Sequence, residues 1–206
     1  MGSKLEKKGR LIVLEGIDGA GKTTQARLLL RRLRYRGYKA AFFREPTRGL
    51  WGREIKRLAR QAGSLTPAEE LDLFVRDRRE NVVKNLKPAL RAGRVVVLDR
   101  YYFSTIAYQG AKCMDTGKIR RMNEAFAVRP DLVVILDVDA GGGLARIAGR
   151  KTRDELFERE DYLVRVRDIF RGFKGPRFVH LDGRGGRREI AKAVWARVQP
   201  LLLPRP

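Results

Sequence analysis

Short apolar segments alternate along the chain with longer segments in which apolar residues recur every three or four positions. The short segments are almost continuously apolar and rich in valine, isoleucine and leucine, which is typical of strands that are covered on both faces, as in a parallel sheet. The longer segments have the period of an amphipathic helix. The pattern predicts strands at 11–15, 40–43, 95–99, 132–137 and 178–181.

The helical segments lie between the predicted strands, and this alternation predicts an α/β fold. We expect three layers, in which helices flank both faces of a five-stranded parallel sheet. No repeat or change in composition marks a second domain, so residues 11–206 are expected to form one domain and the basic residues 1–10 a mobile tail. The predicted helices are 22–36, 51–61, 67–92, 103–109, 118–127, 143–150, 154–173 and 188–202.

The chain is strongly basic and has few residues of the kinds that build metal or nucleophilic sites. Among its 206 residues, 46 are Lys or Arg and 24 are Asp or Glu, which gives a formal net charge of +22. This charge favours an anionic partner, such as nucleic acid, a membrane surface or a phosphorylated small molecule, unless it only solvates the surface. A single cysteine and a single histidine argue against a disulfide, a zinc site and Ser-His-Asp chemistry, so we interpret Cys113 and His180 as structural.

The sequence gives no sign of a membrane segment. Its apolar runs are all shorter than the roughly 18 residues that a membrane span requires. The N-terminus lacks the apolar stretch of a signal peptide. We therefore expect a cytoplasmic protein without a membrane partner.

A glycine-rich segment directly follows the first predicted strand. It reads GIDGAGKT at residues 16–23 and fits the pattern G-x-x-x-x-G-K-[ST]. Glycines at this spacing let backbone N–H groups surround an anion, and the following helix adds its positive N-terminus. Lys22 is expected to reach the β- and γ-phosphates of ATP, and the Thr23 hydroxyl to ligate Mg²⁺. The candidate ATP-binding residues are Gly16, Ile17, Asp18, Gly19, Ala20, Gly21, Lys22, Thr23 and Thr24.

A second Mg²⁺ ligand is expected at the end of a neighbouring strand, and two carboxylates fit. Asp99 and Asp137 each end an apolar strand. Arg100 follows Asp99 at once and would place a cation beside the metal-bound phosphates. We therefore favour Asp99, and an acid that merely ends a strand or caps the next helix is the alternative.

Motifs spread over most of the chain resemble those of one enzyme family. They are LEGIDGAGKTTQ at 14–25, REPT at 44–47, LFVRDRREN at 73–81, DRYYFSTIAYQGA at 99–111, RPDLVVILDVD at 129–139 and RKTRDELFERED at 150–161. Together they resemble the thymidylate kinase family of P-loop nucleoside monophosphate kinases, and the segment 99–111 is the most specific. The resemblance implies a P-loop kinase fold, ATP and dTMP as substrates, dTDP as product, Mg²⁺ as cofactor and a homodimer.

The resemblance also implies how the acceptor nucleotide is bound. Phe74 would stack on thymine, and Arg78, four residues later on the same helix face, would donate to a thymine carbonyl. The alternatives are a core aromatic for Phe74 and a solvated charge face for Arg78. Thr105 and Gln109 would complete the polar edge, and Tyr108 would lie against the sugar. The candidate acceptor-binding residues are Arg44, Phe74, Arg78, Arg100, Ser104, Thr105, Tyr108 and Gln109.

Charged residues would hold the phosphate end of the acceptor. By resemblance, Arg100 holds the acceptor phosphate, and Asp18 contacts the 3′-hydroxyl of dTMP, which would explain a carboxylate inside a phosphate cradle. Arg44 is the favoured further contact, with Arg48 as its rival, because the motif departs here from the REPGG of bacterial members. The bond between Glu45 and Pro46 can be cis or trans, and the sequence does not decide between them.

Residues 143–160 are expected to form a small lid. One branch of the family carries a catalytic arginine in the phosphate-binding loop, whereas Gly19 stands at that position here, as in the branch whose lid supplies the arginines. An arginine that closes over the transferred phosphate could raise the rate by about 10³-fold. A basic solvated helix is the alternative. The candidate catalytic residues are Asp18, Lys22, Arg100, Arg150 and Arg153.

Two other functions remain open on the sequence. A deoxynucleoside kinase shares the fold but needs a general base, commonly a Glu in an E-R-S context, where this chain reads D-R-Y at 99–101. The basic run at 31–36 leaves a nucleic-acid-binding ATPase as an alternative, although nucleic acid is not expected as a partner.

Overall fold

The structure, a computed structural model, describes residues 9–59, 65–146 and 153–203, and the side chains at 153–159 lie outside this description. Five parallel strands form one sheet in the order β2-β3-β1-β4-β5. Each of these strands was predicted from the sequence to within one residue at either end. The strands are β1 (Arg10–Glu15), β2 (Ala40–Arg44), β3 (Val95–Asp99), β4 (Leu132–Asp137) and β5 (Phe178–Asp182).

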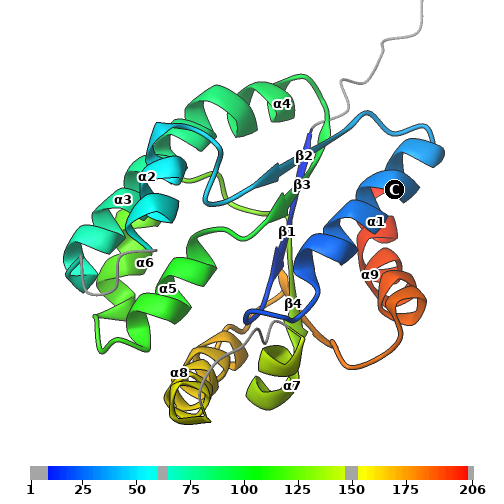
Figure 1. Cartoon of the computed structure of the whole chain (residues 1–206). Coiled ribbons are helices and arrows are strands. Elements are labelled where there is room, and N and C mark those ends of the chain that lie inside the picture. Colours follow the sequence, from blue (N-terminus) through cyan, green and yellow to red (C-terminus); the bar gives the residue numbers. More distant parts are fainter. Residues whose placement is uncertain (1–8, 60–64, 147–152, 204–206) are drawn as a thin grey trace, which may run out of the picture.

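Helices cover both faces of the sheet. Helices α1 and α9 pack together on one face, and α3 to α6 lie on the other, so the predicted three-layer α/β architecture is confirmed (Figure 1). The described helices are α1 (Lys22–Tyr35), α2 (Leu50–Leu58), α3 (Pro67–Asn81), α4 (Lys87–Arg91), α5 (Tyr102–Gly110), α6 (Thr116–Glu124), α7 (Ala140–Ala145), α8 (Arg153–Arg171) and α9 (Arg187–Leu202).

The segment predicted as one helix at 67–92 contains a wider turn. A π-helical turn, η1 (Val82–Leu86), joins α3 to α4, and the backbone N–H of Lys87 bonds to the carbonyl of Val82, five residues earlier. Pro88 lacks an N–H, and its ring would clash with the carbonyl four residues before it in a regular α-helix. The wider turn accommodates the proline, so the prediction of an uninterrupted α-helix is wrong.

The helix predicted at 143–150 begins earlier than expected. Helix α7 starts at Ala140, and the Asp139 carboxylate caps it by accepting a bond from the N–H of Gly142 at 2.6 Å. Three glycines at 141–143 concealed this start, because glycine is a poor helix former. Residues 147–150 lie outside the described part of the chain.

The central strands bring the site together at their carboxyl ends. Strands β1 and β3 are neighbours, with Leu14 opposite Asp99, so the loop after β1 lies beside the loop after β3. All residues of β3, and all of β1 after Arg10, are buried, which gives these loops a rigid base. In parallel α/β sheets, ligands bind at this edge.

His180 and Cys113 were both interpreted as structural from the sequence. The ring Nε2 of His180 on β5 is 2.9 Å from the carbonyl oxygen of Phe173. Cys113 is exposed and unpaired by any disulfide. No helix among the described residues has the length and apolar character that crossing a membrane would take.

Candidate active site

The phosphate-binding loop, residues 16–23, connects β1 to α1 and packs closely against α7. Gly19 has a φ of 79°, and a Cβ atom at this position would come within 2.0 Å of the Gly143 carbonyl oxygen. Only glycine fits both the left-handed backbone and this close approach. The loop therefore has no room for a side chain at position 19. This is the position at which one branch of the family resembled by the sequence carries a catalytic arginine.

Lys22 is buried at the start of α1 without a carboxylate partner at hydrogen-bond distance among the described residues. Its Nζ donates to the carbonyl of Ile17 at 2.6 Å. Burial, together with the charge of Arg100, lowers the pKa of Lys22 from 10.5 to about 7. The positive charge of this buried ammonium group is not balanced by a bonded carboxylate, so the group attracts an anion such as a phosphate.

Asp99 and Thr23 form the pair that was expected to hold Mg²⁺. The Thr23 hydroxyl donates to Asp99 Oδ2 at 2.5 Å, whereas the fully buried Oδ1 has no hydrogen-bond partner among the described residues. A buried carboxylate oxygen without a partner is costly unless a ligand completes it. Mg²⁺ binds in proteins through one or two oxygen ligands plus substrate phosphates, so this pair fits the ion.

The rival carboxylate is occupied elsewhere. Asp137 accepts from Arg167 Nε at 2.5 Å and from Arg171 Nη2 at 2.8 Å, both on α8. Although partial burial opposes it, this pairing with two arginines lowers the pKa of Asp137. The Asp99 carboxylate is therefore bonded to Thr23 of the phosphate-binding loop, whereas the Asp137 carboxylate is bonded to α8.

A pocket of about 200 Å³ opens next to the loop, between α3, α5 and α8. It gathers residues from four separate motifs of the sequence, at 14–25, 44–47, 73–81 and 99–111. Seven of the eight candidate acceptor-binding residues line it, and the exception is Arg44. The lining comprises Asp18, Glu45, Pro46, Glu70, Phe74, Arg78, Arg100, Tyr101, Ser104, Thr105, Tyr108, Gln109, Lys112 and Tyr162.

One end of the pocket combines an aromatic ring with a buried arginine. Phe74 is half-buried and lies outside the hydrophobic core cluster, so its ring is a wall of the pocket and not core packing. Arg78 is only 1% exposed, so the alternative of a solvated charge face is wrong for it.

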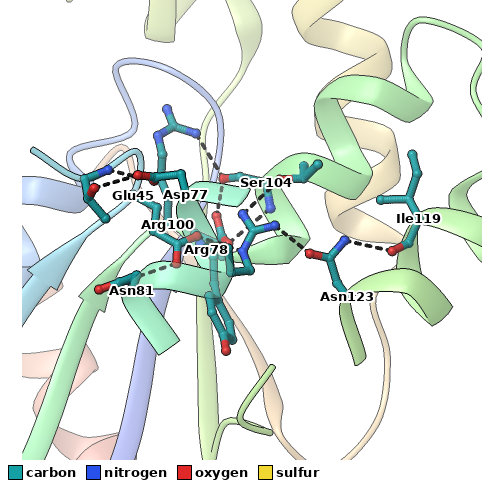
Figure 2. A network of polar contacts seen from close by, with 12 residues as sticks. Glu45, Asp77, Arg78, Asn81, Arg100, Ser104, Ile119 and Asn123 are labelled. Carbon is teal, nitrogen blue, oxygen red and sulfur yellow. Dashed lines mark hydrogen bonds and ion pairs between the residues drawn. The ribbon is translucent and has the colours of Figure 1, made fainter. Parts of the chain in front are cut away.

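Arg78 is held by side chains from three other elements (Figure 2). It donates to Glu45 Oε2 at 2.8 Å, to Asn123 Oδ1 at 2.7 Å and to Thr105 Oγ1 at 2.9 Å. Asn81 donates in turn to the other oxygen of Glu45 at 3.0 Å. Burial raises the pKa of Glu45, which the charge of Arg78 opposes.

The sequence did not indicate this support for Arg78. Asn123 is fully buried on α6, and its amide nitrogen donates to the carbonyl of Ile119 at 2.8 Å. That bond leaves its oxygen for Arg78. Because the two residues are 45 positions apart, no local pattern could have paired them.

Arg100 occupies the other end of the pocket in a strained backbone conformation. Its φ is 71°, a left-handed value that is uncommon for a residue with a side chain. Its guanidinium donates to Asp18 Oδ1 at 2.5 Å and to Ser104 Oγ at 3.1 Å, and lies 5.3 Å from the ring centre of Tyr108. Strain of this kind concentrates at functional sites.

Glu15 is a site residue that sequence reasoning missed. It ends β1, is fully buried, and accepts bonds from Tyr101 N, Ser104 N and Ser104 Oγ at 2.8, 3.1 and 2.5 Å. Burial raises the pKa of Glu15 from 4.5 to about 7. The available signal was an acid at the end of an apolar strand, the same pattern that drew attention to Asp99.

Gln109 lies between the pocket and a neighbouring carboxylate. Its amide nitrogen donates to Glu70 Oε2 at 2.8 Å, and Lys112 also pairs with Glu70. The amide oxygen of Gln109 is buried and has no hydrogen-bond partner among the described residues. It is therefore an acceptor available to a ligand in the pocket.

The REPT segment at 44–47 is held by contacts with β3 and α3. The bond between Glu45 and Pro46 is cis. Thr47 is anchored to α3, since its N–H and hydroxyl donate to Asp77 at 2.8 and 2.5 Å. Arg44 Nε lies 3.5 Å from Asp99 Oδ2, and Arg48 is exposed. Neither arginine lines the pocket.

The described part of the expected lid touches the phosphate-binding loop. Arg146, just after α7, donates to the carbonyls of Gly19 at 3.3 Å and Gly183 at 3.2 Å. Arg150 and the side chain of Arg153 lie outside the described residues.

The site combines a phosphate-binding loop with a neighbouring pocket that has an aromatic wall and two arginines. This is the arrangement of a P-loop nucleotide kinase. A family model described as thymidylate kinase matches residues 14–193. The chain belongs to the thymidylate kinase family.

Curated relatives agree with this assignment. A protein named thymidylate kinase from Akkermansia muciniphila is 44% identical over 189 residues, which cover 92% of this chain and 91% of the relative. Its namesake from Xanthomonas oryzae pv. oryzae is 44% identical over 173 residues, 84% of this chain and 75% of the relative. The protein named thymidylate kinase from Desulfotalea psychrophila is 39% identical over 197 residues, which cover 94% of this chain and 96% of the relative.

Proposed function

We propose that this protein transfers the γ-phosphoryl group of ATP to dTMP and so produces ADP and dTDP. The observation that carries the proposal is one pocket that is lined by Asp18 of the phosphate-binding loop and its partner Arg100 and also by Phe74 and Arg78 of α3. We take Arg100 as its near end and Phe74 with Arg78 as its far end. A nucleotide monophosphate with its base at the far end presents its phosphate to the loop.

The donor is held by the phosphate-binding loop. Its backbone N–H groups and the N-terminus of α1 surround the β- and γ-phosphates, and Lys22 contributes a positive charge to them. Thr23 and Asp99 would hold Mg²⁺, which neutralises charge that develops on the phosphates during transfer. The unpaired Oδ1 of Asp99 supports this assignment.

The acceptor base lies between Phe74 and the polar edge of α5. Stacking of the base on Phe74 is worth about 1–3 kcal/mol. The guanidinium of Arg78 has five N–H donors, and three are used within the protein, so two remain for a thymine carbonyl. The unpaired oxygen of Gln109 can accept the thymine N–H, and Thr105 supports Arg78 from the other side.

The sugar and phosphate of the acceptor face the loop. Tyr108 lies against the deoxyribose, Asp18 accepts the 3′-hydroxyl, and Arg100 with Ser104 beside it binds the phosphate. An oxygen of this phosphate attacks the γ-phosphorus in line, and the bond from that phosphorus to the bridging oxygen of ADP breaks. The attacking oxygen is already ionised, so the reaction needs no general base.

The lid completes the site in this proposal. Residues 143–160 close over the nucleotides, and Arg150 and Arg153 stabilise the charge on the transferred phosphoryl group. The described start of this segment supports the placement, because Arg146 already touches the carbonyl of Gly19. We further propose that the protein acts in the cytoplasm as a homodimer.

The test is a coupled assay of ADP release with dTMP, dUMP, CMP, AMP and thymidine as acceptors. We expect turnover to be fastest with dTMP. Equal rates with all monophosphates, or no turnover of dTMP, would refute the proposal. A preference for thymidine over dTMP would identify a deoxynucleoside kinase, and ATP hydrolysis stimulated by nucleic acid a nucleic-acid-dependent ATPase.

A further inference from the structure

A buried carboxylate lies behind Arg100 and takes no part in the mechanism above. We propose that Glu15 is a positioning residue that orients Arg100 through Ser104, and so sets the affinity for the phosphate group of the acceptor. This inference rests on the proposed binding of dTMP in the pocket. Glu15 is on β1, whereas Ser104 is on α5, 89 residues later.

The first line of argument is the direction of the hydrogen bonds. Above pH 7, where Glu15 is ionised, its carboxylate can only accept, so Ser104 Oγ donates its single hydrogen to Glu15 Oε2, 2.5 Å away. The lone pairs of Ser104 Oγ are then free to accept from Arg100 Nη1 at 3.1 Å. Glu15 therefore fixes a chain in which Arg100 donates to Ser104 and Ser104 donates to Glu15 (Figure 2 shows Arg100 and Ser104).

The second line of argument is the backbone around Arg100. Glu15 Oε1 accepts from Tyr101 N at 2.8 Å and from Ser104 N at 3.1 Å. Tyr101, the N-cap residue of α5, makes no side-chain capping bond, so β1 supplies the acceptor that the helix start lacks. These bonds hold the residues that follow Arg100 and so maintain its strained φ of 71°.

The third line of argument is charge. Glu15 is 0% exposed, and the cations that act on it are Arg100 and Lys22. Arg100 also pairs with Asp18, whose side chain is 36% exposed at the edge of the pocket. The guanidinium thus lies between a fixed buried carboxylate and a more exposed one, and an incoming phosphate can replace the second but not the first.

The experiment compares binding of dTMP with binding of thymidine, by calorimetry, without ATP. The two ligands share the base and sugar, so the ratio of their dissociation constants reports the phosphate contact. In Glu15→Gln, an amide N–H₂ must face either Ser104 or the two backbone N–H groups, which reverses or breaks the chain. We expect dTMP binding to weaken about 10-fold and thymidine binding to stay within twofold.

Ser104→Ala provides an independent test, because it removes the link and leaves Glu15 bonded to the backbone. This variant should also lower the ratio of the dissociation constant of thymidine to that of dTMP. The double variant Glu15→Gln with Ser104→Ala should lower this ratio no further than the more damaging of the two single substitutions. The matched control is Asp137→Asn, another acid at a strand end, which contacts Arg167 and Arg171 instead and should leave the ratio unchanged.

A merely structural Glu15 gives a different result. The variants would then lower the unfolding temperature while dTMP and thymidine weakened equally or not at all, and this outcome would overturn the proposal. Should Glu15→Gln fail to fold, an unchanged ratio in Ser104→Ala alone would also overturn it. If the unmodified protein binds neither ligand, the proposed function fails and not only the role of Glu15.

Discussion

The pocket and the phosphate-binding loop beside it form a site whose two ends are built in opposite ways, and we call the pocket around Arg78 the base end and the loop with Asp99 the transfer end. At the base end, Arg78 and Glu45 are buried and joined to each other, and Asn123 completes the set. At the transfer end, among the described residues, Lys22 is a buried cation with a hydrogen bond to a carbonyl alone, and Asp99 Oδ1 has no hydrogen-bond partner. At the base end the buried charge is balanced within the protein, whereas at the transfer end it is not.

This difference separates recognition from catalysis. A base end whose hydrogen-bond donors are already oriented binds its ligand without rearrangement. Moving such a donor costs free energy, because the buried groups that it bonds are then left unpaired. A transfer end with unbalanced charge interacts most strongly with the phosphates and with the charge that develops on them. Substitutions at the two ends should therefore change different kinetic parameters.

The largest effect is expected at Lys22. Lys22→Met removes the charge but keeps an unbranched chain of similar length, and we expect kcat to fall by about 10³-fold. The unfolding temperature should not fall, because the variant no longer buries an incompletely paired ammonium. Rates from the coupled ADP assay and a thermal melt check both statements. A loss of activity below tenfold would show that the transfer end does not depend on this charge.

A smaller effect is expected at Asp99. Asp99→Asn keeps the shape of the side chain but removes its charge, so the Mg²⁺ concentration for half-maximal activity should rise about 100-fold. A Mg²⁺ titration of the initial rate measures the shift. Asp137→Asn serves as the control, since Asp137 contacts α8. The assignment of the metal site is wrong if both variants shift the titration equally.

Arg78 tests the base end. Arg78→Lys keeps the charge near Glu45, but one ammonium cannot serve Asn123, Thr105 and the base together. We expect KM for dTMP to rise on the order of 30-fold, with a much smaller change in kcat. Arg79→Lys is the matched control, because Arg79 is exposed on the same helix. A loss confined to kcat would remove the distinction between the two ends.

The choice between Arg44 and Arg48 predicts a smaller difference. Arg44→Ala should lower kcat/KM for dTMP about threefold, since Arg44 lies 3.5 Å from Asp99 and its side chain is half exposed, where pairing is weak. Arg48→Ala should have no measurable effect. Steady-state kinetics of the two variants measure kcat/KM for dTMP. A larger loss in Arg48→Ala than in Arg44→Ala would identify Arg48 as the contact.

The pH dependence of stability gives the smallest effect. Burial raises the pKa of Glu15 to about 7, so the folded protein retains a proton that the unfolded chain releases near pH 4.5. The free energy of unfolding should therefore decrease as the pH rises through this interval. Thermal melts of the ligand-free protein should show a decrease of a few degrees in the unfolding temperature, and Glu15→Gln a shallower one. Parallel curves for the two proteins would contradict the assignment.

The sequence predicts the sheet well and singles out the candidate donor site, because both follow from local patterns. Strands buried on both faces are continuously apolar, and the glycine spacing of the loop reflects one backbone geometry. The π-helical turn before Pro88 and the early start of α7 were missed because the deciding residues break the helical pattern. The choice of Asp99 over Asp137 gains its physical reason only from Arg167 and Arg171, which a distant helix supplies.

The supports of the acceptor site are the part that the sequence could not predict. Asn123 meets Arg78 across 45 residues, and Glu15 meets Ser104 across 89. Such pairs depend on how helices pack on the sheet, which no pattern within one segment records. The residues that would touch a ligand stand out by motif, whereas those that hold them in place emerge only in three dimensions.

The contact between Gly19 and Gly143 has a consequence for how this enzyme can change. A catalytic guanidinium cannot be moved from the lid into the loop by a single exchange at position 19, because the backbone of α7 already fills the space where its first carbon would be. An arginine at position 19 would require the backbone of α7 to move away from the loop at the same time. In this chain a steric barrier therefore opposes an arginine at position 19, and a positive charge over the transferred phosphate has to come from outside the loop.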